Sequence, residues 1–153
     1  MNLTPHFTRD EFTRSDRAAS IGLVNAPNNR QWSVIEGLSL HVLEHARAWC
    51  GAIEVTSGYR CQKLNELVGG AYGSDHQVLS TSAGVDIRAK YVSQARLFRF
   101  LWTETPWSRL IWYESRGPHV SWDKAGPPAG RVARRSIAGG EYPSMTFEEV
   151  VAL

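Results

Sequence analysis

The spacing of apolar residues divides the chain into helical and extended segments. Between Arg30 and Cys50, apolar residues recur every three or four positions, which predicts a long amphipathic helix. The same period predicts a helix over 93–104. Thr8, followed three residues later by Glu11, forms a capping-box pattern that predicts a short helix near the start of the chain. Shorter helices are expected over 61–68 and 144–153.

Alternating apolar and polar residues mark the strands. Segments 52–57 and 83–89 alternate in this way, and 109–114 and 119–123 are expected to pair as a hairpin closed by 115–118. The sequence therefore predicts an α+β fold in which helices pack on a small antiparallel sheet.

The hairpin loop also predicts a register. A loop of four residues would place Glu114 directly opposite His119, with both side chains on one face of the sheet. That face would be lined by Trp112, Glu114, His119 and Ser121, and the apolar face by Ile111, Tyr113, Val120 and Trp122. Asp123 shares the face of His119 but lies about 13 Å along the strand.

Composition and charge narrow the class of protein. A hydrophobic content of 42% excludes a disordered chain, and a net charge of +2 with scattered basic residues does not predict nucleic-acid binding. We find no membrane-length apolar run and no signal-peptide pattern, so we expect a monomer that is made in the cytoplasm without stable membrane association. We expect one domain, with a main part over 1–126 and a turn-rich, basic C-terminal extension over 127–153.

Two patterns could suggest metal or redox chemistry but are better explained otherwise. His41, Glu44 and His45 form an H-x-x-E-H motif, yet helical geometry turns Glu44 away from the apolar stripe and towards solvent. We therefore interpret it as a chance match. Cys50 and Cys61 have no close metal-ligand spacing, and we expect both to be reduced.

A stronger candidate set is His76, Asp86 and His119. His76 follows a glycine-rich loop, Asp86 interrupts an apolar strand, and His119 begins another strand. Such isolated polar residues often only satisfy local hydrogen bonds. As a group, however, two histidines and a carboxylate leave the fourth position of a tetrahedral zinc open to water.

At these residues the chain resembles a known family. The segments VTSGYR, LNELVGG, SDHQVLSTSAGVDI and HVSW occur in the order found in zinc D-alanyl-D-alanine carboxypeptidases and L-alanyl-D-glutamate endopeptidases, whose fold the hedgehog signalling domain shares. The opening segment HFTRDEFTRSDRAA is similar to small phage-type members. The resemblance extends from about Leu3 to Asp123.

The resemblance implies zinc ligands at His76, Asp86 and His119 and a substrate-anchoring arginine at Arg60. It also implies a general base, which many relatives carry as a Glu three residues before the last histidine. This chain has Arg116 at that position, so Glu114 is our candidate instead. Asp123 is the competing candidate. Further substrate contacts are expected from Tyr59, Ser74, Trp112 and Ser121.

The chain departs from the family pattern between the first two ligands. This stretch is three residues longer than in the family, and Ser82 and Gly84 replace the expected Gly and Ala. We expect the longer loop to lie over the cleft and to affect substrate choice.

The function that follows is a zinc-dependent peptidase that cuts peptidoglycan stem peptides in the bacterial cell wall or periplasm. Carboxypeptidase and endopeptidase action both remain open, as do phage and bacterial origins. The alternative is a non-catalytic wall-binding or virion structural module on the same fold.

Overall fold

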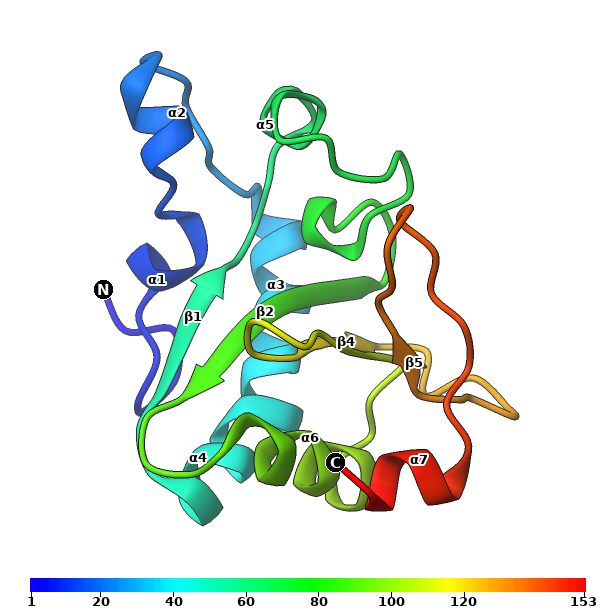
Figure 1. Ribbon diagram of the computed structural model, residues 1–153. Coiled ribbons are helices and arrows are strands. Elements are labelled where there is room, and N and C mark those ends of the chain that lie inside the picture. Colours follow the sequence, from blue (N-terminus) through cyan, green and yellow to red (C-terminus); the bar gives the residue numbers. More distant parts are fainter.

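The four alternating segments and a short fifth strand, which was not predicted, form one sheet in the order β1-β2-β4-β3-β5. The computed structural model describes residues 1–153 and is drawn in Figure 1. The strands are β1 (Ile53–Ser57), β2 (Ser82–Ala89), β3 (Arg109–Trp112), β4 (His119–Asp123) and β5 (Arg134–Arg135). The predicted α+β class is confirmed. Only β5 pairs in parallel, with β3, so the sheet is mixed rather than wholly antiparallel.

Short helices surround this sheet, and the predicted helical segments are confirmed. Thr8 and Glu11 form the expected capping box at the first of them. The helices are α1 (Arg9–Thr13), α2 (Asp16–Ser20), α3 (Asn29–Leu38), α4 (Glu44–Cys50), α5 (Gln62–Leu67), α6 (Gln94–Glu104) and α7 (Phe147–Val151), with a π-helical turn η1 (Ser39–Leu43) and a 3₁₀ turn η2 (Asp75–Gln77). No helix is long and apolar enough to cross a membrane.

The long helix predicted over 30–50 is present as α3, η1 and α4 in direct succession, and α3 lies behind the sheet in Figure 1. The Ser39 hydroxyl donates to the Ile35 carbonyl at 2.9 Å, where the helix widens into the π turn. Its apolar stripe packs on the sheet, and Leu38 and Val42 are fully buried. This packing leaves the opposite face of the sheet for polar side chains.

Strand alternation decides which residues face α3 and α6. Val85 and Ile87 of β2 belong to the buried core together with Val120 of β4. Asp86 and His119 lie directly opposite each other on the antiparallel β2–β4 pair. Because neighbouring residues along a strand point to opposite faces, both side chains point away from the helices.

The predicted hairpin register is wrong. Ile111, not Glu114, lies opposite His119, and β3 ends at Trp112. The reason is that the chain before His119 packs against β2, where the Ile87 amide donates to the Pro118 carbonyl at 3.0 Å. The connecting loop is therefore longer than predicted.

The C-terminal segment 127–153 packs against the rest of the fold. Beside β3 it supplies β5, at the right of Figure 1, and α7 lies below this strand near α6. Three of its side chains, Ala133, Met145 and Val150, are part of the hydrophobic core. The outer edge of β3 is therefore covered.

Candidate metal centre

Two of the candidate ligands come from adjacent strands. Asp86 in β2 and His119 in β4 form a directly opposed pair, and His119 Nδ1 lies 2.9 Å from Asp86 Oδ1. Both side chains are more than nine-tenths buried. Strand pairing thus fixes the distance between these two donors.

The third candidate ligand, His76, comes from η2, above the face of the sheet that carries Asp86. Its Nδ1 lies 2.7 Å from the Gly58 carbonyl oxygen, and its Nε2 lies 3.5 Å from Asp86 Oδ1. A carbonyl can only accept, so Nδ1 carries the proton and the Nε2 lone pair of the neutral ring faces Asp86. A carbonyl partner of this kind is typical of metal-ligating histidines.

The segment SGYR needs a glycine at position 58, because the backbone of α1 approaches it closely. A Cβ at this position would clash with the Phe12 carbonyl oxygen. The same carbonyl accepts a hydrogen bond from the Tyr59 amide at 2.6 Å. The close approach of α1 therefore holds the Gly58 carbonyl in the position that orients His76.

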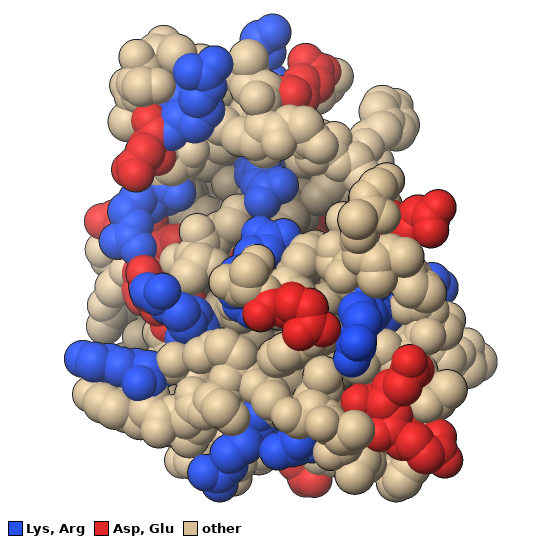
Figure 2. Space-filling model, viewed as in Figure 1, with Lys and Arg blue, Asp and Glu red and all other residues tan.

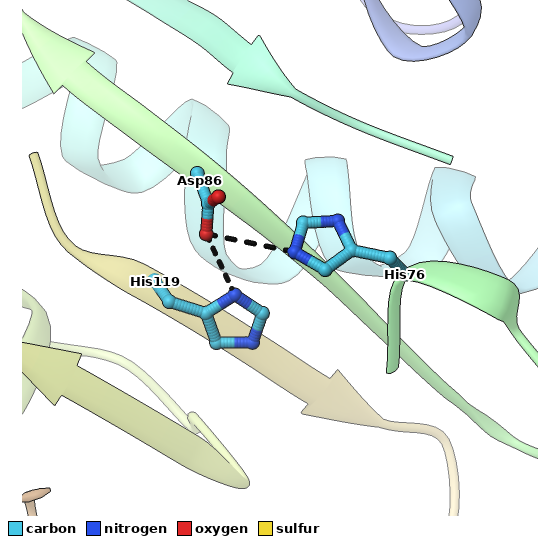
Figure 3. A group of neighbouring side chains, drawn as sticks. All are labelled: His76, Asp86 and His119. Atoms are coloured by element: carbon cyan, nitrogen blue, oxygen red, sulfur yellow. Dashed lines mark hydrogen bonds and ion pairs between the residues drawn. The ribbon is translucent and has the colours of Figure 1, made fainter. Parts of the chain in front are cut away.

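Figure 3 shows the three side chains converging on one point. One potential ligand atom from each of His76, Asp86 and His119 lies within 4.8 Å of the others, and all three residues are buried. Two imidazole nitrogens and a carboxylate are ligands that zinc prefers, and they leave a fourth position open. The residues therefore fit a zinc ion.

The electrostatics of the cluster favour the forms that bind a metal. Burial alone would raise the pKa of Asp86, but its close contacts with the ring nitrogens of His119 and His76 outweigh burial and hold this pKa well below its usual range. Burial lowers the pKa of His76. Near neutral pH the carboxylate is charged and the His76 ring is neutral.

Arginines surround the outer oxygen of Asp86. Arg116 Nη1 lies 3.1 Å from Asp86 Oδ2, and Arg60 Nη2 lies 3.8 Å from it. Ser57 holds Arg60 in place, because Arg60 Nη2 and Nε donate to the Ser57 hydroxyl at 2.8 Å and 3.2 Å. Arg116 stacks over the Tyr113 ring at 3.8 Å. Both guanidinium groups are therefore oriented before any substrate arrives.

The three donors lie in a cleft of about 820 Å³. Its lining includes the glycine-rich loop 68–71 on one side and residues 128–132 of the C-terminal segment. Figure 2 shows basic side chains near the middle of this face of the molecule. The arginines that line the cleft are Arg60, Arg109, Arg116, Arg131 and Arg134, and the acidic residues are Asp75 and Asp86. The cleft is therefore suited to an anionic ligand.

The predicted substrate-binding residues are found in different places. Arg60 and Ser74 line the cleft. Trp112 does not, because the true register turns it towards Phe98, with 5.6 Å between ring centroids. Tyr59 belongs to the hydrophobic core. Ser121 is fully buried beneath the cleft.

Glu114 lies outside the metal cleft. Its carboxylate is 64% exposed and lies 3.5 Å from Arg135 Nη1. It lines a neighbouring hollow that also borders Asp86. Asp123, the competing candidate, accepts hydrogen bonds from Thr81 and from the Ala125 amide and does not line the cleft. The hairpin geometry that led to the Glu114 prediction is absent.

The longer loop after His76 does not lie over the cleft as predicted. Residues 79–81 instead line a separate hollow beside α3. Arg30 of α3 donates to the Val78 and Ser80 carbonyl oxygens, and Gln31 donates to the Gln77 carbonyl. The extra residues are therefore held against the helix.

A polar pair next to His119, formed by Ser121 and Asp75, was not predicted from the sequence. The Ser121 hydroxyl lies 2.9 Å from His119 Nε2 and donates to Asp75 Oδ2 at 2.7 Å. A Cβ at Gly84, opposite Ser121, would lie 2.7–2.8 Å from atoms of Ser121, Asp75 and His119. One position in the sequence is consistent with this crowding, since Gly84 replaces the alanine of the family pattern.

The H-x-x-E-H motif takes no part in the metal cluster. His41 stacks on Trp122 with 5.2 Å between ring centroids. Glu44 does not face solvent as predicted, because it accepts hydrogen bonds from the Thr4 hydroxyl at 2.7 Å and the His6 amide at 3.0 Å. The carboxylate therefore anchors the N-terminal segment to the helix.

Comparison with models of protein families finds a match to Peptidase M15 over residues 5–121. No curated protein and no solved structure matches the chain. The matched range includes all three buried donors and ends before the C-terminal segment. It supports the resemblance at the level of the family, while the carboxypeptidase, endopeptidase and phage-type assignments stay predictions. With three quarters of its length matched and a buried set of zinc donors inside the match, the chain belongs to the peptidase M15 family of zinc-dependent peptidases.

Proposed function

We propose that this protein is a zinc-dependent peptidase that hydrolyses peptide bonds in the stem peptides of bacterial peptidoglycan. The observation that carries the proposal is the convergence of His76, Asp86 and His119 in a cleft lined by five arginines. Stem peptides are rich in carboxylates, and a guanidinium group can hold a carboxylate with two parallel hydrogen bonds. The bacterial cell wall is the corresponding site of action.

The residues of this chain have separate tasks in this proposal. His76, Asp86 and His119 would hold zinc, which when bound acts as a Lewis acid and lowers the pKa of water. Arg60 binds a carboxylate or a peptide carbonyl of the substrate. Its hydrogen bonds to Ser57 use Nε and one proton of Nη2, so Nη1 and the second Nη2 proton are available for two parallel hydrogen bonds to the substrate.

Glu114 remains our prediction for the group that accepts a proton from the attacking water. Its place in the fold sets a condition, because the carboxylate must leave Arg135 and turn towards Asp86 to reach the metal cleft. Glu114→Gln is therefore expected to keep zinc but to lose hydrolysis by about 10²–10⁴-fold. Hydrolysis near the parent rate would exclude Glu114 as the base.

The type of bond can be determined from the products. Mass analysis of purified peptidoglycan fragments after incubation with the zinc-loaded protein distinguishes removal of a terminal D-Ala from a cut within the stem. We expect one of these two products. Fragments of unchanged mass would contradict the proposed function and would favour the non-catalytic wall-binding or virion module.

The metal ligands can be tested with a matched control. His76→Ala and His119→Ala are expected to lose both bound zinc and hydrolysis, whereas His45→Ala should keep both. His45 is exposed and belongs to the H-x-x-E-H motif outside the cluster. Zinc that is retained in the first two variants and lost in the third would reverse the assignment.

The alternative of a non-catalytic module has lost its main argument. That argument was the longer loop between His76 and Asp86, which was expected to alter the cleft. The loop packs beside α3 instead. The remaining argument for it is the place of Glu114, which lies outside the metal cleft.

A further inference from the structure

His119 takes part in two sets of contacts, one through each ring nitrogen. Nδ1 faces Asp86 at 2.9 Å, and Nε2 lies 2.9 Å from the Ser121 hydroxyl oxygen. The Ser121 hydroxyl in turn donates to Asp75 Oδ2 at 2.7 Å, and Arg109 Nη1 lies 3.2 Å from the same oxygen. The contacts form a chain from the ring of His119 through Ser121 and Asp75 to Arg109.

The direction of hydrogen bonding along this chain follows from proton counting. A hydroxyl group has one proton, and Ser121 gives it to the Asp75 carboxylate, which can only accept. Ser121 can therefore only accept from His119, so Nε2 must carry a proton. In the neutral ring this leaves the lone pair on Nδ1, on the side of Asp86 and His76.

We propose that Ser121 and Asp75 act as positioning residues that fix the tautomer of His119, so that its Nδ1 is the metal-binding atom. The inference rests on the proposed function, because it takes His119 as a zinc ligand. Gly58 has the same effect on His76 through the opposite nitrogen, Nδ1. Together these partners direct two lone pairs at Asp86, an arrangement that is favourable only when a cation lies among them.

The surroundings of Ser121 restrict its hydroxyl to contacts with His119 and Asp75. Its side chain is fully buried, and the opposing residue, Gly84, has no side chain that could occupy the same space. The serine hydroxyl therefore has no access to substrate. Its hydrogen-bonding capacity is used by the ring and the carboxylate.

Zinc affinity provides the first test. The metal-free protein and its variants are titrated with zinc in competition with a chromophoric chelator. Ser121→Ala is expected to weaken zinc binding by about 10–100-fold. Asp75→Asn should cause a smaller loss, because the amide oxygen can still accept from Ser121. Ser39→Ala is the matched control and should have no effect, since Ser39 is equally buried but donates only to a backbone carbonyl in the long helix.

The ring proton provides a second test that a general loss of stability would not reproduce. Long-range ¹⁵N–¹H correlation spectra of the zinc-loaded protein should show the proton of His119 on Nε2. This proton should exchange slowly with water in the parent protein and faster in Ser121→Ala or Asp75→Asn. A proton on Nδ1, or zinc affinity unchanged in Ser121→Ala, would overturn the inference.

The two proposals fail in different ways. If the parent protein binds no zinc, or if His76→Ala leaves zinc binding unchanged, the metal centre itself is wrong. If His76→Ala abolishes zinc binding while Ser121→Ala and Asp75→Asn match the parent, only the role of the positioning residues is wrong.

Discussion

Replacing Gly84 with alanine adds a single methyl group beside the metal centre. The new Cβ would lie 2.7 Å from Ser121 Oγ, 2.8 Å from Asp75 Cβ and 2.8 Å from His119 Cε1. All three distances are below the 3.4 Å at which ordinary contact begins. Asp75 Cβ and His119 Cε1 are not free side-chain ends, and Ser121 Oγ is held by its contacts with His119 and Asp75, so the strand or the ring must move.

The expected cost follows from this overpacking. Forcing an extra methyl group into a well-packed interior costs about 1–3 kcal/mol of folding free energy. With a urea m-value of about 2 kcal/mol/M, a loss of this size lowers the unfolding midpoint by about 0.5–1.5 M. The displaced ring should also weaken zinc binding, because ligand geometry decides the affinity of such sites.

Urea unfolding of the metal-free protein and zinc competition are the appropriate assays. Gly73→Ala is the control, because a Cβ at Gly73 has no neighbour within 4 Å and its φ is not positive. It should leave zinc affinity unchanged and alter stability by less than about 1 kcal/mol. A Gly84→Ala protein with the midpoint and zinc affinity of the parent would refute the packing described for this site.

Three further predictions concern other parts of the molecule. The pKa of Glu44 is lowered because hydrogen bonds from Thr4 and His6 outweigh burial, so its contribution to stability is present above its ordinary value of 4.5 and is lost as the pH falls through the lower folded value. Glu44→Gln should therefore be less stable than the parent by about 1–3 kcal/mol at neutral pH, and urea unfolding should show this difference shrinking in acid. Arg60→Lys should keep zinc but lower kcat/KM for stem peptides, because an ammonium cannot form two parallel hydrogen bonds; unchanged kinetics would remove Arg60 from substrate binding. Both cysteines are free, and burial raises the pKa of Cys50, so a mild thiol reagent should modify Cys61 first, as mass spectrometry can show, without release of zinc.

The clustering of His76, Asp86 and His119 could be predicted because each lies in a short motif that resembles the family pattern. Alternation along 83–89 correctly directed Asp86 away from the core, and alternation along 119–123 did the same for His119. The register between strands could not be predicted from alternation. It depends on where the loop after Trp112 packs, and the hydrogen bond from the Ile87 amide to the Pro118 carbonyl fixes that position.

Contacts between distant segments were also beyond the sequence. Asp75 and Ser121 are 46 positions apart, and neither belongs to a pattern that would pair them. Arg60 could be assigned to the cleft through its motif, whereas Arg131 and Arg134 reach it only because β5 pairs with β3. Local motifs therefore indicated the three candidate metal donors, and only the folded chain showed which residues support them.

The candidate metal donors and one wall of the cleft come from different parts of the chain, because the C-terminal segment supplies that wall. All three metal donors lie within the family match, whereas residues 128–132 line the cleft and lie beyond it. The segment is tied to the fold by Ala133, Met145 and Val150, so a replacement would have to keep apolar side chains at these positions. Exposed residues of the same wall, such as Val132 and Arg134, carry no such constraint. Exchanging them would alter the shape and charge of the cleft around an unchanged metal centre, which makes this segment the natural place to engineer a different substrate range.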